Sequence, residues 1–211
     1  IKMLRHPQEF GVTSSKYLPY VSILPAFSAL QEHVRTLPAD KRLNAQRKVR
    51  FWYWAAIFTN RYSGSVESTA ARDYQNVKAW IESDANEPPL IQEFKSRFKN
   101  LELRRETKYG SSIYNGIFNL LVLNGARDWI TGNIPENELL DDHHIVPASW
   151  GDANLQDRSA HSILNRTPLL DETNRHVIRD KLPNKYLPEL IEQNGESRVR
   201  AILESHLISP A

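Results

Sequence analysis

The sequence predicts a mainly α-helical protein whose C-terminal part holds a small unit of strand, loop, strand and helix. Long apolar runs at 51–58 and 117–123 predict helices buried on all sides, because a helix at the surface keeps a polar face. By contrast, His144 is followed by a β-branched pair that stops at Pro147, which predicts a short strand ending where a backbone donor is lost. Helices therefore form the body, and the strands are confined to the C-terminal part.

The helical body is expected to take in residues 1–138. Residues 1–15 show little periodicity and are interpreted as a linker or as the tail of a preceding domain, and 16–37 as a helix broken by prolines. Glycine and proline then separate the remaining segments, which gives further helices at 40–62, 65–81, 89–98 and 112–130.

The smaller unit is expected at 139–211. Asn165 to Leu170 form its second strand, and Asp171 is a candidate N-cap for a helix from Glu172, because its carboxylate can accept a backbone N–H. On an α-helix that starts there, Asn174, Ile178 and Lys181 would share one face. Amphipathic helices follow at 183–193 and 198–207.

Composition limits the choice of function classes. The net charge of +2 is too small to identify a nucleic-acid binder, although the excess of basic residues lies in the first 141 positions. The chain has no cysteine, which excludes disulfides and thiolate metal sites and fits a reducing cytoplasm. No apolar run approaches the length of a membrane span, and the chain does not open on a signal-peptide pattern. We therefore expect a soluble, cytoplasmic protein without a membrane partner.

One stretch carries a recognisable motif. Asp142-His143-His144-Ile145-Val146-Pro147 is followed by Asn165, 21 residues after His144, and by Asn174, nine residues further on. This spacing resembles the HNH, or ββα-metal, nuclease motif, whose signature positions fall on His144, Asn165 and Asn174. The sequence of residues 165–187 is similar to the C-terminal HNH domain of GmrSD-type restriction proteins and of SspE-type anti-phage nucleases. The resemblance covers about residues 140–190. Many of these proteins carry Asp where this chain has His143.

The resemblance implies a metal-dependent endonuclease that nicks or cleaves DNA. His144 would be the general base, since a near-neutral imidazole can take a proton from water at physiological pH. His143 and Asn174 would hold a divalent metal; Mg²⁺ suits an amide-oxygen ligand best, with Mn²⁺, Ni²⁺ or Zn²⁺ as alternatives. Asn165 would hold His144 in place by bonding loop backbone. Asp142 is a further candidate ligand.

The family also implies partners. Arg175, Arg179 and Lys181 are candidate phosphate contacts, and the substrate would be phage DNA or modified DNA. An N-terminal domain of the same longer chain would sense the modification or hydrolyse nucleotide, as in bacterial restriction and antiviral defence proteins. Adjacent residues on a strand point to opposite faces, so His143 and His144 can serve one site only if the strand end is twisted or one side chain turns.

Two other functions compete with this one. A non-catalytic DNA-binding or interaction module could retain the ββα fold, and a nuclease of this chemistry could cleave RNA instead of DNA. Each site residue also has a structural interpretation, as a buried histidine, a first-turn helix residue or a solvated charge. Elsewhere, Trp52 and Trp54 are assigned to the core, and Arg61 to Ser65 to a helix-ending turn.

Overall fold

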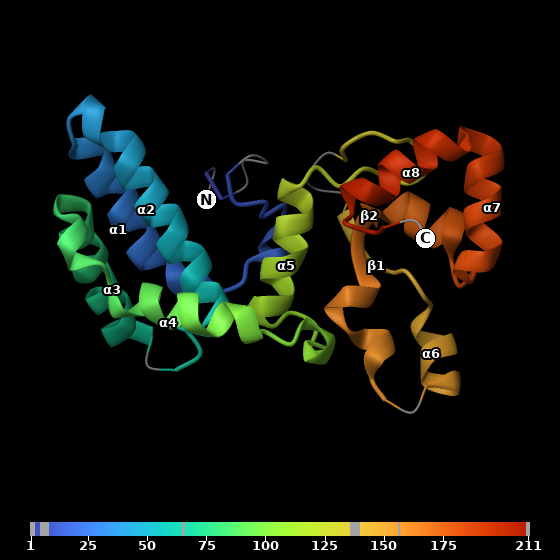
Figure 1. Ribbon diagram of the computed structural model, residues 1–211, viewed down its shortest axis with the longest axis horizontal. Coiled ribbons are helices and arrows are strands. Elements are labelled where there is room, and N and C mark those ends of the chain that lie inside the picture. The colour runs from blue at the N-terminus through green and yellow to red at the C-terminus, as the bar shows by residue number, and fades with distance from the viewer. Residues whose placement is uncertain (1–2, 5–8, 65, 136–139, 156, 210–211) are drawn as a thin grey trace. The chain divides into compact units, whose positions relative to one another are not determined.

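The computed structural model describes residues 3–4, 9–64, 66–135, 140–155 and 157–209. It is mainly helical, as predicted, and its described residues include one two-stranded antiparallel sheet (Figure 1). The chain divides into two compact units, one of residues 19–101 and one of residues 1–18 with 102–211. Among the helices of the described residues, none combines the length and the apolar character needed to cross a membrane.

The unit of residues 19–101 is built of helices. Their bounds are α1 Leu24–Thr36, α2 Ala39–Phe58, α3 Val66–Glu82 and α4 Pro89–Arg97. Helix α2 contacts the other three, which explains why its second half has no polar face. Trp52, Tyr53 and Ile57 are fully buried there, and Trp54 is half-buried, so the predicted core helix is confirmed.

A buried carboxylate ties α2 to α3. Asp73 is 2% exposed and accepts hydrogen bonds from Trp52 Nε1 at 3.1 Å and from the Tyr62 hydroxyl at 3.1 Å. The Arg61 guanidinium completes the set with Nη2 at 2.8 Å from Asp73 Oδ1. The turn predicted after α2 is present from Arg61 to Gly64, while Ser65 lies outside the described residues, and Arg61 has a structural partner in α3.

The unit of residues 1–18 and 102–211 holds the sheet. Its elements are α5 Ser112–Leu123, β1 Leu140–His144, α6 Ala148–Asn154, β2 Arg166–Leu170, a π-helix Thr173–Ile178, α7 Pro183–Asn194 and α8 Glu196–Ser205. Strands β1 and β2 pair antiparallel, with His143 opposite Thr167 and His144 opposite Arg166. Short 3₁₀ turns across the two units are Ser15–Tyr17, Val21–Ile23, Asp84–Asn86, Phe98–Asn100, Leu103–Arg105, Ser159–His161 and Ile163–Asn165.

The core of this unit lies beside β2 and the C-terminal helices. It is formed by the buried side chains of Trp129, Leu169, Ile178, Tyr186, Leu190, Val199, Ile202 and Leu203. A second cluster forms where Tyr17 stacks on Phe118 of α5, with ring centroids 4.0 Å apart. The strands are thus held between apolar clusters, which fixes the positions of the side chains that they present.

The N-terminal segment is part of this unit. Leu4, Phe10 and Val12 are buried, and the Val12 amide donates to the Leu4 carbonyl at 3.1 Å. The interpretation of residues 1–15 as a linker is therefore wrong for the residues that the structure describes. Sequence periodicity could not show this, because isolated apolar side chains can pack without forming a regular element.

The division of the chain also differs from the expected one at 138, a boundary that itself lies outside the described residues. Helix α5 was assigned to the helical body, but it contacts β2 and the N-terminal turn. An apolar run predicts burial without showing which neighbour buries it. The helix also ends at Leu123, seven residues earlier than expected, because the chain turns at Gly125, whose φ is +80°.

The helix after β2 departs from the predicted form. It is a π-helix, its N-cap is Glu172 rather than Asp171, and no side chain caps it by a hydrogen bond. It ends at Ile178, and Arg179 adopts a left-handed φ of 55°. Lys181 is consequently not on the helix, and the expected shared face of Asn174, Ile178 and Lys181 does not form.

A buried histidine links this unit's stability to pH. His206 is 3% exposed; its Nδ1 lies 2.5 Å from the Thr167 hydroxyl, and its Nε2 lies 2.6 Å from the Arg127 carbonyl. Burial lowers the pKa of His206 to about 4, although the bond to Arg127 and the charge of Asp128 oppose this shift and His143 adds to it. The unfolded chain binds that proton near pH 6.5, so acidification favours unfolding.

We expect the unfolding free energy to fall by up to roughly 1.4 kcal/mol per pH unit, for this group alone, as pH drops from about 6.5 toward about 4. Denaturant unfolding at about pH 7 and about pH 5 measures the slope. His206→Gln removes the titrating group, so its slope should be shallower than that of the unaltered protein even if its stability at neutral pH is lower. Equal slopes in the two proteins would contradict this origin of the pH dependence.

Candidate functional site

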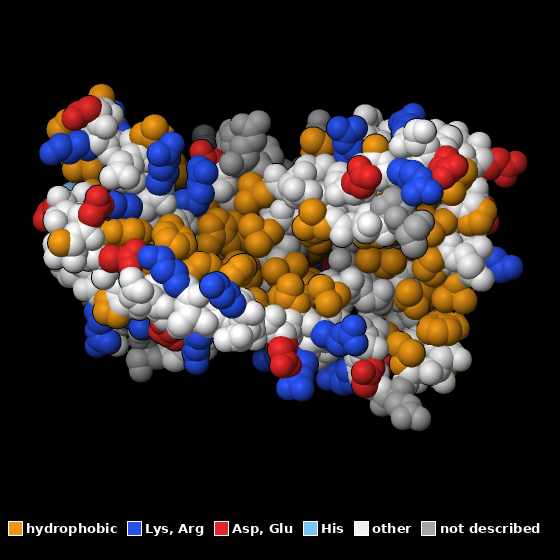
Figure 2. All heavy atoms as spheres, in the orientation of Figure 1, with side chains coloured by type: hydrophobic (Ala, Val, Ile, Leu, Met, Phe, Trp, Pro, Cys, Tyr) orange, Lys and Arg blue, Asp and Glu red, His pale blue; other side chains and the backbone are white. Residues whose placement is uncertain are grey.

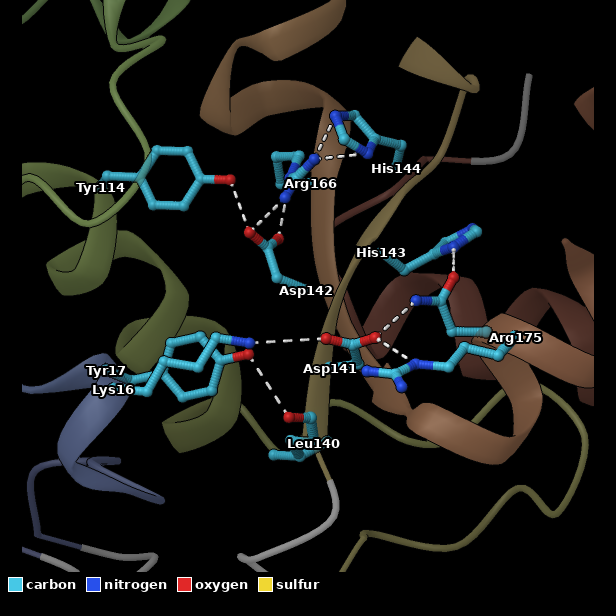
Figure 3. Close-up of polar contacts among 11 residues, drawn as sticks. Lys16, Tyr17, Tyr114, Leu140, Asp141, Asp142, His143, His144, Arg166 and Arg175 are labelled. Atoms are coloured by element: carbon cyan, nitrogen blue, oxygen red, sulfur yellow. Dashed lines mark hydrogen bonds and ion pairs between the residues drawn. The ribbon is translucent and has the colours of Figure 1, made fainter. Parts of the chain in front are cut away.

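Strand β1 presents polar side chains on both of its faces. Because successive residues of a strand alternate, Asp141 and His143 share one face, while Asp142 and His144 share the other. Figure 3 shows the two sets, with Tyr114 and Arg166 meeting Asp142, and Lys16 and Arg175 reaching Asp141. The site is therefore two neighbouring clusters separated by the backbone of β1.

On the first face, His143 meets Asn174 of the π-helix. His143 Nδ1 lies 2.6 Å from Asn174 Oδ1, and the histidine is 1% exposed. Since an amide oxygen only accepts, Nδ1 carries the proton in this pair, which leaves a lone pair on Nε2. Nε2 is buried and has no hydrogen-bond partner among the described residues. Burial lowers the pKa of His143, partly opposed by the Asn174 bond, so the imidazole is neutral at physiological pH.

Asp141 fixes the orientation of the Asn174 amide. Asn174 Nδ2 donates to Asp141 Oδ2 at 2.9 Å, which turns its oxygen toward His143. Lys16 Nζ at 3.5 Å and Arg175 Nε at 3.3 Å also lie beside the same carboxylate. Burial alone would raise the pKa of Asp141, but the Asn174 bond, the Asp142 backbone amide and these cations lower it. Asp141 was not among the predicted site residues, although its position two residues before His143 on one strand places it on the same face as His143.

On the second face, Asp142 is held by Arg166 and Tyr114. Arg166 Nε donates to Asp142 Oδ1 at 2.8 Å, Arg166 Nη2 contacts Oδ2, and the Tyr114 hydroxyl donates to Oδ2 at 2.7 Å. Both oxygens of this 8% exposed carboxylate are therefore in use, and they lie on the face opposite His143. The expectation that Asp142 is a further ligand beside His143 is not supported by this geometry.

His144 lies on this second face as well. Arg166 Nη1 contacts its ring nitrogens, and the His161 ring lies 5.9 Å away. Burial, and then the Arg166 charge, lowers the pKa of His144 to about 4, which keeps the imidazole neutral at physiological pH. The structure thus brings His143 and Asn174 together but places His144 across the strand from them. Arg166 reaches both Asp142 and His144, as expected for two residues on the same face of β1.

Asn165 joins the two ends of the loop between the strands. Its Oδ1 accepts from the Val146 amide at 2.8 Å, and its Nδ2 donates to the Val146 carbonyl at 2.7 Å and the Ala160 carbonyl at 2.8 Å. The backbone adds a bond from the Ile145 amide to the Asn165 carbonyl at 2.9 Å. Asn165 therefore contacts loop backbone next to His144, as the predicted positioning role requires.

The three predicted phosphate contacts do not form one surface. Arg175 pairs with Asp141, while Lys181 Nζ lies 2.5 Å from Glu189 Oε2. Arg179 Nε donates to the His176 carbonyl at 3.2 Å, beyond the end of the π-helix. Arg175 and Arg179 do not lie along one helix, because the π-helix ends at Ile178. Of the three, Arg175 alone contacts the cluster around His143.

The donor atoms around His143 suit a divalent ion. A neutral imidazole nitrogen and an amide oxygen are both metal ligands, and the short distance between them means that one ion could contact both in place of the shared proton. Within the described residues, no three His, Cys, Asp or Glu side chains gather as a metal-binding group. A metal here would therefore depend on the amide oxygen of Asn174.

The chain is similar to a protein of unknown function from the archaeon Methanocaldococcus jannaschii. The two are 30% identical over 217 residues, which cover 95% of this chain and 36% of the relative. The chain thus spans about a third of the length of that relative. No protein-family model and no solved structure matches this chain.

Proposed function

We propose that this chain is a metal-dependent endonuclease of the HNH type that nicks or cleaves DNA. The observation that carries the proposal is the contact between His143 and Asn174, two residues 31 positions apart whose ligand-type atoms meet at 2.6 Å beside the end of β1. A neutral histidine follows on the same strand, and an asparagine fastens the adjoining loop. The three signature positions of the HNH resemblance, His144, Asn165 and Asn174, all belong to this arrangement, whereas His143 stands where many of those proteins carry Asp.

In the proposed reaction each residue has a separate task. His144 takes a proton from the attacking water, for which its neutral imidazole is the competent form. Arg166, which is held by Asp142 and through it by Tyr114, lowers the pKa of His144 and so helps to keep the imidazole neutral. Asn165 keeps the loop after His144 in place.

On the other face of β1, His143 and Asn174 would hold the ion, and Asp141 sets the direction of the Asn174 oxygen. A divalent ion bound there would polarise the scissile phosphate and stabilise the leaving oxygen. Because His144 lies across the strand, the phosphate must sit over the C-terminal end of β1 to reach both faces. Mg²⁺ is the first candidate, and Mn²⁺, Ni²⁺ and Zn²⁺ are to be tested beside it.

Incubating supercoiled plasmid with the protein tests this function directly. We expect nicked or linear product with at least one of these four ions and none with excess chelator. Asn174→Ala should weaken both metal binding, measured by calorimetry without DNA, and cleavage, because it removes one of the two proposed ligands. Asn194→Ala, which changes a half-buried asparagine at the end of α7, is the matched control and should leave both unchanged.

The same experiment distinguishes the proposed nuclease from the rival function, a non-catalytic module. A non-catalytic DNA-binding or interaction module would bind plasmid without cutting it under any of the metal conditions, which would refute the nuclease proposal. RNA of matched sequence, run in parallel, decides which sugar the site accepts. As for its context, we place the protein in the cytoplasm as the effector of an antiviral restriction system, acting on phage or modified DNA with a sensor or NTPase domain.

A further inference from the structure

A groove with an exposed tryptophan borders the candidate site. It has a volume of about 350 Å³, at the lower end of the range of small-molecule sites, and is lined by Arg104, Trp150, Leu155, Ser159, Leu164 and Asn165 among others. Asn165 and Val146, both lining residues, are also the residues that fasten the loop after His144. The groove therefore begins within two residues of the proposed general base.

Several of the side chains that line the groove are apolar and exposed to solvent. Trp150 is 40% exposed, Leu155 38% and Leu164 56%, and Trp150 is the only exposed residue among the five tryptophans, all of which the structure describes. Figure 2 shows hydrophobic side chains gathered at the surface in the region of α6. An exposed apolar patch rimmed by polar residues is typical of an interaction surface or a ligand-binding groove.

The position of Trp150 is set by close packing behind it. Helix α6 rests on the 3₁₀ turn Ser159–His161 through Gly151, where an added Cβ would come within 2.2 Å of Ala160 Cβ. The Ala160 carbonyl is in turn held by Asn165. The indole is thus presented on a short helix whose base is fixed to the same asparagine that orders the site.

The polar groups of the groove favour a nucleotide over a peptide. Arg104 is exposed, and among the described residues it makes no hydrogen bond or salt bridge, although its charge acts on the nearby Asp157; its guanidinium donors are therefore open to a phosphate. The Asn165 amide is already committed to backbone atoms, and Ser162 bonds to Leu103 and Leu164. Few groups remain to read the edge of a base. An aromatic face beside a cation, with little hydrogen-bonding capacity, is the chemistry of sequence-tolerant base stacking.

We infer that this groove binds one unpaired nucleobase, stacked on Trp150, next to the phosphate that lies at His144. A base can enter only when it is out of the duplex stack, so the preferred nucleic acid is single-stranded or locally melted. This inference rests on the proposed function, since it takes its strand to be the one that is cut. It adds a substrate class: strands with an unpaired base at the site, with little preference for its identity.

Binding to a fluorescent single-stranded oligothymidylate, measured by anisotropy in excess chelator, tests the groove without any chemistry. Trp150→Ala should weaken this binding about 5- to 150-fold, the equivalent of ~1–3 kcal/mol for one stacked base at ~1.4 kcal/mol per tenfold. Trp150→Phe should keep most of the affinity, because a phenyl ring still stacks. Leu207→Ala, which removes an even more exposed apolar side chain elsewhere, should have no effect.

Two results would overturn the inference: unchanged affinity in Trp150→Ala, or equal affinity of the unaltered protein for the oligonucleotide and its fully paired duplex. Arg104→Gln should lower the affinity and flatten its salt dependence if the guanidinium meets a phosphate. Failure of the nuclease proposal has a different signature. In that case metal-dependent cleavage is absent while the Trp150-dependent binding persists.

Discussion

Replacing His144 with alanine is expected to reduce metal-dependent cleavage by about 10²- to 10⁴-fold, the usual contribution of a positioned general base. The ring is neutral at physiological pH, since burial and Arg166 lower its pKa to about 4. Removing it should not unfold the sheet, because the Arg166 guanidinium keeps its bonds to Asp142. The measurement is the initial rate of plasmid nicking, with circular dichroism to show that the fold persists.

His161→Ala is the matched control. It removes the neighbouring imidazole, whose ring lies 5.9 Å from that of His144 and whose Nε2 pairs with Asp152 at 2.9 Å. Because His161 has no task in the proposed reaction, its loss should change the rate only a few-fold. Full activity in His144→Ala would remove that residue from the mechanism. A large loss in both variants would point instead to damage to the loop that carries His161.

The second large effect concerns stability. Asp73→Ala should lower the unfolding free energy by about 3–5 kcal/mol, because it leaves Arg61, Trp52 Nε1 and the Tyr62 hydroxyl without their shared acceptor. Arg61 has a 26% exposed side chain and can recover some hydration, which favours the lower part of that range. Denaturant unfolding followed by tryptophan fluorescence measures the change.

Two further variants sharpen this result. Asp73→Asn keeps an acceptor oxygen but loses the charge, so its loss should lie between those of the alanine variant and the unaltered protein. Glu82→Ala removes an exposed carboxylate from the same helix and should stay within about 0.5 kcal/mol of the unaltered protein. A change below about 1 kcal/mol for Asp73→Ala would show that water replaces the three contacts.

Helix positions were predictable where apolar runs meet proline or glycine. The buried half of α2 and the proline-started α7 lie close to where the sequence put them, because their signals are local. The packing of α5 and of the N-terminal residues was not predictable, since contacts between segments a hundred residues apart leave no periodic pattern. Asn119 of α5, for example, donates to the Tyr17 carbonyl at 3.0 Å.

For the candidate site, the motif brought His143 and Asn174 into one hypothesis, and the structure places them in contact. It could not show that the helix carrying Asn174 is a π-helix, because i→i+5 bonding has no distinctive residue spacing. Nor could it identify Arg166 and Asp141 as the neighbours of His144 and Asn174. Both assignments depend on the strand register, in which His144 faces Arg166, and on the tertiary packing that the register permits.

The bonds of Asn165 to Val146 and Ala160 have a consequence for how such proteins can diverge. They close the segment 147–159 into a loop whose two ends stay together whatever lies between them. Insertions, deletions or exchanges inside that loop would leave β1 and β2 in register, and the loop is where Trp150, Leu155 and Ser159 are found. Related proteins could therefore acquire a new substrate preference through changes in this one surface loop, while the reactive side chains on the strands are retained.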